Sequence, residues 1–270
     1  MNEQSLKLGE IVDLTHYPIT SVGSPEYEDL IARCQASLVE KGALRLNGFV
    51  KPEAIERMAS EAAALSGEAY QQNDQFTAYI GDEVPDDLPE DHPRRLMQRT
   101  AQAAVAWDLI PPAAALRVFY ESDELTNFIA DVMGKATLYR SADPLAACNL
   151  AYIKDGDELG WHFDSSEFSV TLQIQAPETG GVFEFVPFTR NAQDQNYDKV
   201  RDVLLGSDEG VRKSPCEAGV LSIFKGHDAL HRVTSVEGPQ ARVTAVLTYA
   251  ETPDFRVSDQ SKRLFYGRLA

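Results

Sequence analysis

The stretch Trp161-His-Phe-Asp-Ser-Ser-Glu-Phe-Ser-Val-Thr-Leu-Gln-Ile-Gln-Ala176 decides the fold. From Phe168 onward apolar and polar residues alternate, which is the period-2 pattern of a β-strand with one buried face. Similar short runs between Gly and Pro turns predict further strands at 146–153, 182–187, 218–224, 231–236 and 241–249. A polar stretch at 188–215 interrupts this series and predicts a helix-containing insertion between two strands.

The first half of the chain follows the helical period instead. A stripe of apolar residues at every fourth position predicts a helix over residues 25–40, and Pro52 opens a second helix. A third helix is expected between Ser122, a suitable N-cap, and Gly134, a suitable C-terminal stop. Helices followed by many short strands predict an α+β chain with a double-sheet barrel toward its C-terminal end.

The overall charge limits the classes of partner. The 270 residues hold 25 Lys and Arg against 42 Asp and Glu, a formal net charge of −17. This acidity disfavours nucleic acid and anionic membrane surfaces as partners, although it can equally serve solubility. The sequence has no run of the roughly 18 apolar residues that a membrane helix needs, and its start lacks a signal-peptide pattern. Three scattered cysteines form neither a disulfide framework nor a zinc pattern, so a cytoplasmic location is expected.

One segment concentrates acidic residues. Residues 81–91 hold six acids and two prolines, which predicts a loop. The loop is either a solvated surface excursion or a lid over a substrate site.

Two histidines and an aspartate have the pattern of metal ligands. His162 and Asp164 are two positions apart just before the alternating strand, and side chains at such positions of an extended chain project to the same side. His231 follows on a later predicted strand. Two imidazoles and one carboxylate on one face of a metal leave the opposite positions open, which is the ligand set of non-haem Fe(II) oxygenases. The alternative is a turn-capping Asp beside a surface His.

Arg242 adds a second chemical element. It lies on the last predicted strand and shares one face with Thr244, Val246 and Thr248. An arginine that points into a barrel needs an anionic partner, because an unpaired buried guanidinium is costly. Its planar fork fits a carboxylate held by two hydrogen bonds. The partner is either a bound cosubstrate or an internal Asp or Glu.

In combination these motifs resemble the Fe(II)/2-oxoglutarate-dependent oxygenase superfamily. The matching elements are Tyr152-Ile-Lys-Asp-Gly-Asp-Glu-Leu-Gly-Trp-His-Phe-Asp164, Gly180-Gly-Val-Phe-Glu-Phe185, Gly219-Val-Leu-Ser-Ile-Phe-Lys-Gly-His227, His231-Arg-Val-Thr234 and Arg242-Val-Thr244. The resemblance implies one domain over 1–270, with a double-stranded β-helix (jelly roll) at 136–250. The mainly helical residues 1–135 would pack on it, and 251–270 would form a C-terminal extension.

The resemblance also implies roles for the matched residues. The implied catalytic iron ligands are His162, Asp164 and His231. Arg242 would pair with the distal carboxylate of 2-oxoglutarate, with Thr244 and Tyr152 as supporting hydrogen-bond donors. The implied cofactor is Fe(II), with 2-oxoglutarate and O₂ as cosubstrates and ascorbate as a stimulating reductant. Succinate and CO₂ would be released.

Within the superfamily, the chain most resembles small bacterial enzymes that act on free amino acids, the lysine radical halogenases and their hydroxylase relatives. The helical first half and Tyr139-Arg-Ser-Ala-Asp-Pro144 carry this likeness. The halogenases replace the carboxylate ligand by a small residue, so that chloride can bind the metal there. Because Asp164 retains the carboxylate, the expected reaction is hydroxylation of an unactivated C–H bond in a free amino acid or a related metabolite.

The expected substrate contacts lie near the metal residues or on the Arg242 face: Asp157, Glu158, Ser165, Glu167 and Thr248. Acids there would favour a cationic amine or a basic amino acid, whereas a solvated turn explains Asp157 and Glu158 equally well. Ser165 stands where the lysine-acting relatives have an acid, which argues against lysine itself. Two other classes stay open, namely an oxygenase acting on a protein side chain or another specialised metabolite, and a non-catalytic metal-binding barrel.

Overall fold

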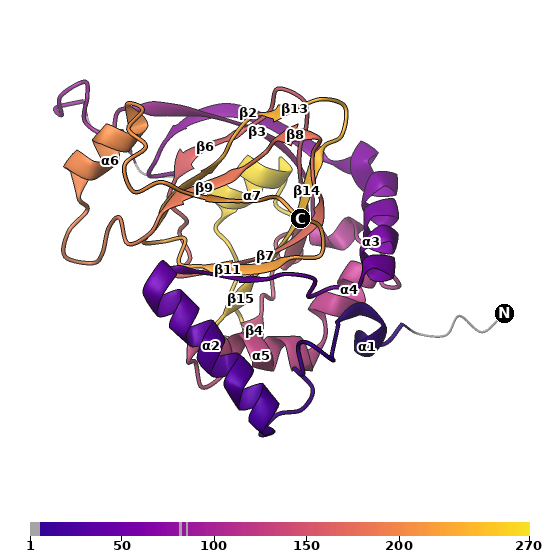
Figure 1. The fold of residues 1–270 in the computed structure, drawn as a ribbon. Helices are drawn as coiled ribbons and strands as arrows, with labels where there is room; N and C mark the ends of the chain where they lie inside the picture. The colour runs from indigo at the N-terminus through magenta and orange to yellow at the C-terminus, as the bar shows by residue number, and fades with distance from the viewer. Residues whose placement is uncertain (1–5, 81–82, 85) are drawn as a thin grey trace.

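A curled antiparallel sheet forms the centre of the computed structural model, which describes residues 6–80, 83–84 and 86–270 (Figure 1). Its strands in chain order are β1 (Ala43–Leu46), β2 (Tyr70–Thr77), β3 (Met97–Val105), β5 (Cys148–Ile153), β6 (Leu159–His162), β7 (Ser169–Gln175), β9 (Phe183–Val186), β10 (Arg212–Ser214), β11 (Leu221–Phe224), β12 (Leu230–Val233) and β14 (Arg242–Leu247). Two small sheets pair β4 (Tyr139–Arg140) with β15 (Tyr249–Ala250), and β8 (Thr179–Gly180) with β13 (Val236–Glu237).

The large sheet folds into two layers. Its strand order is β1-β11-β7-β14-β5-β3-β6-β12-β9-β10, with β2 added to β3. Strand β3 connects the layers, because it pairs with β5 in the larger one and with β6 in the smaller one. This arrangement confirms the predicted α+β fold with a double-stranded β-helix core.

The helices are α1 (Leu8–Ile11), α2 (Pro25–Lys41), α3 (Pro52–Leu65), α4 (Ala115–Tyr120), α5 (Asp123–Met133), α6 (Tyr197–Leu204) and α7 (Asp259–Tyr266), with 3-10 turns η1 (Ser66–Glu68) and η2 (Trp107–Leu109). Helix α2 packs on α5 and β1, and α3 packs on β7, so these helices cover the larger layer (Figure 1). The three predicted helices are confirmed as α2, α3 and α5. The Ser122 hydroxyl caps α5, and Gly134 ends it at a φ of 64°.

Alternation gives the two faces of each central strand different surroundings. On β7, Val170 and Leu172 belong to the main apolar core beneath the helices. The intervening Ser169 and Thr171 line a cavity between the two layers. The polar face of this strand therefore points into the barrel rather than into bulk solvent.

The first half of the chain is less helical than predicted. It contributes β1, β2 and β3 to the barrel. Strands β2 and β3 are rich in Gln and Ala and poor in β-branched residues, so their intrinsic strand propensity is low. Pairing of β3 with β5 stabilises the extended conformation instead. The insertion at 188–215 contains α6, as expected, and also β10, which extends the smaller layer.

Two further predictions concern loops and membranes. In the acidic loop, residues 83–84 and 86–91 form no helix or strand, and residues 81, 82 and 85 lie outside the described part of the chain. The lid role of this loop stays a prediction. Among the helices described here, none has the length and apolar run to cross a membrane.

Candidate metal centre

The two layers bring His162, Asp164 and His231 together. His162 ends β6 and is the direct cross-strand partner of His231 on β12. Asp164 follows two residues after His162, and its Oδ1 lies 3.6 Å from His162 Nε2 and 3.4 Å from His231 Nε2. One ligand atom from each residue lies within 4.8 Å of the other two, which is compatible with a single metal ion.

Backbone carbonyls fix the orientation of both imidazoles. His162 Nδ1 lies 2.8 Å from the Gly160 carbonyl oxygen, and His231 Nδ1 lies 2.8 Å from that of Ala229. A carbonyl only accepts hydrogen bonds, so each Nδ1 carries the proton and each Nε2 presents its lone pair toward Asp164. Metal-binding histidines are commonly held in this way.

Electrostatics keep His162 and Asp164 in their ligand forms. Burial lowers the pKa of His162, and the neighbouring His231 lowers it further, which favours the neutral imidazole. Burial alone would raise the pKa of Asp164. The neighbouring imidazoles, His231 first, outweigh that effect and hold the pKa of Asp164 well below its usual range, so the carboxylate is ionised. Two imidazole nitrogens and one carboxylate form a donor set that fits a divalent metal such as Fe(II).

The Asp164 carboxylate is held in place by its neighbours. Ser169 Oγ donates to Asp164 Oδ2 at 2.5 Å, and the Asp164 amide donates to the Gly226 carbonyl at 3.1 Å. A Cβ at Gly226 would overlap the Asp164 carboxylate, so only glycine fits beside this carboxylate without a shift. Sequence reasoning missed both Ser169 and Gly226 as supporting residues.

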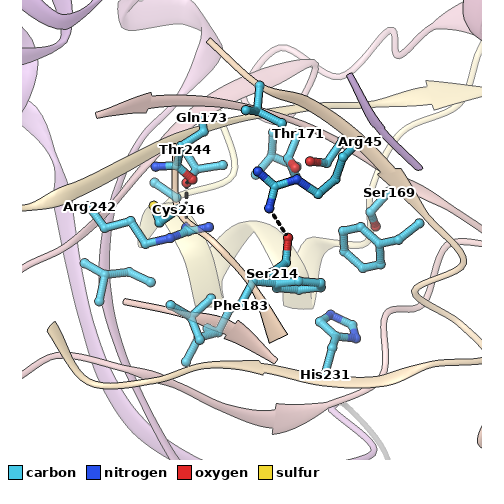
Figure 2. A pocket seen from close by; sticks show the side chains of 18 of the residues that line it. Arg45, Ser169, Thr171, Gln173, Phe183, Ser214, Cys216, His231, Arg242 and Thr244 are labelled. Carbon is cyan, nitrogen blue, oxygen red and sulfur yellow. Dashed lines mark hydrogen bonds between the residues drawn. The ribbon is translucent and has the colours of Figure 1, made fainter. Parts of the chain in front are cut away.

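These metal residues line a cavity of about 170 Å³ that extends to Arg242 (Figure 2). Arg242 Nη1 donates to Thr244 Oγ1 at 2.6 Å, and Thr244 Oγ1 donates to Gln173 Oε1 at 3.1 Å. The Gln173 amide is itself fixed by the Val243 carbonyl at 2.9 Å. The network orients the guanidinium toward the cavity but leaves its positive charge without a counterion.

Arg242 has no internal acidic partner. Its Nε is buried without a hydrogen-bond partner, and no carboxylate of the described residues forms an ion pair with its guanidinium. The alternative of an internal Asp or Glu therefore lacks a candidate in the part of the chain described. A partly buried guanidinium without a counterion fits a bound carboxylate, as 2-oxoglutarate would supply.

A second guanidinium, that of Arg45 on β1, lines the same cavity. Arg45 Nη1 donates to Ser214 Oγ at 2.5 Å and to the Pro215 carbonyl at 2.7 Å. Its Nη2 lies 3.2 Å from a carboxylate oxygen of Glu217. Figure 2 shows Arg45 and Ser214 between Arg242 and His231. Sequence reasoning did not single out Arg45.

The structure places Tyr152 away from the cavity, which corrects its expected role as a cosubstrate donor. Its hydroxyl donates to the Ala62 carbonyl at 2.7 Å within the main core. Adjacent strand residues project to opposite faces, so Ala151 and Ile153 line the cavity instead. Thr244 does lie at the cavity, beside Arg242.

None of the expected substrate contacts lines the cavity. Asp157 and Glu158 each lie 3.5 Å from the guanidinium of Arg99, and Glu167 lies 2.8 Å from Lys135 Nζ. The other two are an exposed loop residue, Ser165, and a residue beyond the end of β14, Thr248. The cavity instead holds uncharged polar side chains that sequence reasoning missed, among them Gln102, Thr171, Gln173 and Ser222. The sequence signal that could have identified them is the alternation of polar with apolar residues along the strands, which places the polar residues together on one face.

Comparisons with known proteins agree with this geometry. A sequence profile of the family described as halogenase D matches residues 27–264. No curated protein gives a significant match.

Solved structures share the fold at low sequence identity. AviO1 from Streptomyces viridochromogenes Tue57 is 18% identical, with a TM-score of 0.57 over 84% of this chain and 97% of that one. A 2OG-Fe(II) oxygenase family oxidoreductase from Burkholderia pseudomallei is 16% identical (TM-score 0.52; 83% and 92% covered). A prolyl-4-hydroxylase from Pseudomonas putida is 14% identical (TM-score 0.51; 81% and 98%).

At these identities the structures establish the fold, and the profile establishes the family. The profile match begins in α2 and ends in α7, so it includes the metal residues, Arg242 and most of the surrounding helices. The chain belongs to the halogenase D family and has the fold of the Fe(II)/2-oxoglutarate-dependent oxygenase superfamily.

Proposed function

We propose that the protein is an Fe(II)/2-oxoglutarate-dependent dioxygenase that hydroxylates an unactivated C–H bond of a small molecule, a free amino acid or an amino-acid-derived metabolite. The position of Asp164 carries the proposal. Its carboxylate faces both imidazole Nε2 atoms at 3.6 and 3.4 Å, and Ser169 and the Gly226 backbone hold it there.

Each part of the cavity has a defined task in this reaction. When bound, Fe(II) with 2-oxoglutarate and O₂ supplies the oxidant for C–H hydroxylation, with release of succinate and CO₂. His162, Asp164 and His231 would hold the metal on one face. Arg242 would bind a carboxylate of 2-oxoglutarate, and Thr244 keeps the guanidinium turned toward it. The rigid strands supply the fixed orientation on which such chemistry depends.

Asp164 also supports hydroxylation over halogenation. The lysine radical halogenases that this chain resembles have a small residue at the corresponding position, where chloride then binds the metal. Here a partly buried, ionised carboxylate stands at that position. A halide would have to displace it against the support of Ser169 and the Gly226 backbone, so we expect no halogenated product.

A non-catalytic metal-binding barrel is less well supported. A structural metal site has no use for Arg242, whose buried Nε lacks a partner. The expectations of a cytoplasmic location and of no nucleic-acid or membrane partner stay predictions from the charge of −17.

Succinate formation tests the proposal. Purified protein would be incubated with Fe(II), ascorbate, 2-oxoglutarate and O₂, with each proteinogenic amino acid in turn and with or without chloride. The expected result is succinate formation stimulated by at least one amino acid, and a product heavier by one oxygen atom whether or not chloride is present. A chlorinated product would contradict the proposed reaction, and absence of any succinate would contradict the oxygenase function itself.

A further inference from the structure

The barrel contains a buried amide without a hydrogen-bond partner. Gln72 on β2 is 4% exposed, and in the described part of the chain neither its Nε2 nor its Oε1 has a partner. Buried polar groups in folded proteins nearly always form hydrogen bonds, because leaving water without compensation costs free energy. An unpaired donor and an unpaired acceptor in one side chain point to a ligand that carries both a hydrogen-bond acceptor and a hydrogen-bond donor.

Strand pairing turns this amide toward the interior of the barrel. Gln72 is directly opposite Gln102 in the antiparallel register of β2 and β3, and directly opposite residues share a face of the sheet. Gln102 lines the same cavity as the metal residues and is 8% exposed. Its side-chain amide also forms no hydrogen bond with any described residue. Two neighbouring amides without partners therefore lie on one inner face.

The C-terminal helix closes this region off from bulk water. Helix α7 packs on β2 and β3. Tyr266 at its end belongs to one apolar cluster with Ala104, which lies two residues beyond Gln102 and on the same face of β3. In such a shielded environment a hydrogen bond to a ligand is stronger than in water.

The charges in the cavity indicate what kind of ligand fits. The acids expected to attract a cation, Asp157, Glu158 and Glu167, are paired with basic residues and do not line the cavity. The charged side chains that do line it, apart from the histidines, are two acids and two arginines, namely Asp164, Glu217, Arg45 and Arg242. Their charges cancel, and those of Fe(II) and the 2-oxoglutarate dianion cancel each other. The loaded cavity is thus electrically neutral and favours a ligand group without net charge.

We infer that Gln72 and Gln102 form a subsite for the zwitterionic head group of a free α-amino acid. The amide N–H groups would donate to the carboxylate of the substrate, and an amide oxygen would accept from its ammonium group. A zwitterion presents the acceptor and the donor that the two amides lack, and it adds no net charge. This inference rests on the proposed function and adds the two residues that would bind the head group of such a substrate.

Gln72→Met tests the subsite, because methionine keeps the length of the side chain and removes both polar atoms. Gln75→Met is the matched control, since Gln75 lies on the opposite face of β2 and is exposed. The amino acid that most stimulates succinate formation in the unmodified protein would serve as the probe, beside its decarboxylated amine. We expect Gln72→Met to raise the KM for the amino acid about tenfold to a hundredfold, as the loss of one or two hydrogen bonds to charged groups implies. Gln75→Met should leave it unchanged.

A second readout separates binding from folding. Removal of an unpaired buried amide should leave the Tm of Gln72→Met equal to or above that of the unmodified protein. Gln102→Met provides a second test at the neighbouring amide, with the same expected rise in KM. If neither variant changes the KM, or if the decarboxylated amine binds as well as the amino acid, the head-group subsite is wrong while the oxygenase function stands. If the unmodified protein forms no succinate at all, the proposed function fails as well.

Discussion

Gly226 is the position where the smallest covalent change should have the largest effect on the metal centre. A Cβ on this residue would meet the Oδ2, Cγ and Cβ atoms of Asp164, the last two at 2.8 and 3.0 Å. The same Oδ2 accepts the hydrogen bond from Ser169, so the carboxylate cannot move away without losing that support. Gly226→Ala therefore forces either the loop or the ligand to shift.

The magnitude follows from these contacts. An extra methyl group in a close-packed site costs about 1–3 kcal/mol of stability. Displacing a group that supports a metal ligand typically weakens metal binding by about 10–100-fold, which corresponds to about 1.4–2.8 kcal/mol. The two free energies are of similar size, as expected if the carboxylate moves out of its metal-binding position to relieve the steric strain. We expect Gly226→Ala to bind Fe(II) about 10–100-fold more weakly and to lose most succinate formation at limiting iron.

The assay compares Fe(II) titrations of the unmodified protein, Gly226→Ala and Gly67→Ala. The last is the control, because a Cβ at Gly67 would meet no atom within 4 Å. Succinate formation against iron concentration gives the apparent affinity, and a thermal melt of each metal-free protein reports the folding cost. If Gly226→Ala matched the unmodified protein in iron affinity, Asp164 would not be a ligand in the position described.

The remaining predictions address the other parts of the site and its support. His162→Ala and Asp164→Ala should each abolish succinate formation, and full activity in either variant would show that the metal assignment is wrong. Arg242→Met should raise the KM for 2-oxoglutarate about 10–100-fold, since it removes charge-assisted hydrogen bonds to a carboxylate, and an unchanged KM would leave Arg242 without a cosubstrate role. Burial would raise the pKa of Asp143, but two backbone amides and Lys262 at 3.1 Å outweigh burial and hold the pKa below the ordinary 3.8. The ionised carboxylate therefore stabilises the fold at neutral pH, and this contribution is lost as the pH falls through the lowered pKa. Asp143→Asn should therefore lower the Tm at neutral pH, because it removes the ion pair with Lys262 that holds α7 in place. The difference in Tm from the unmodified protein should shrink in acid, and a difference that does not depend on pH would contradict this reasoning.

The metal residues could be predicted because their geometry is largely local. An extended chain projects His162 and Asp164 to the same side whatever surrounds it. The spacing of Arg242 and Thr244 on one strand face works in the same way, and the structure joins their side chains at 2.6 Å. Sequence alone could not show that β6 pairs with β12 so that His162 lies opposite His231. That register depends on contacts between segments far apart in the chain.

Tyr152 shows where the alternation of apolar and polar residues cannot indicate which face of a strand lines the cavity. In the second half of β5 both faces are apolar, with Leu150 and Tyr152 in the main core and Ala151 and Ile153 at the cavity. A strand buried on both faces does not reveal in its sequence which face meets the helices. The expected role of Tyr152 relied on resemblance alone, and the structure assigned the residue to the other face.

The polar lining of the cavity was missed for a related physical reason. Acidic residues before and after the metal motif suggest a charged mouth, yet Arg99 and Lys135 neutralise them outside the cavity. Uncharged polar residues on strands suggest a solvent-facing surface, yet in this barrel they face inward, as Gln102 and Gln173 do. Charges on a surface can find partners there, whereas the buried amide of Gln72 has no partner among the described residues. Neutral polar side chains at alternate strand positions, rather than the acids, are therefore the better markers of the cavity lining in this fold.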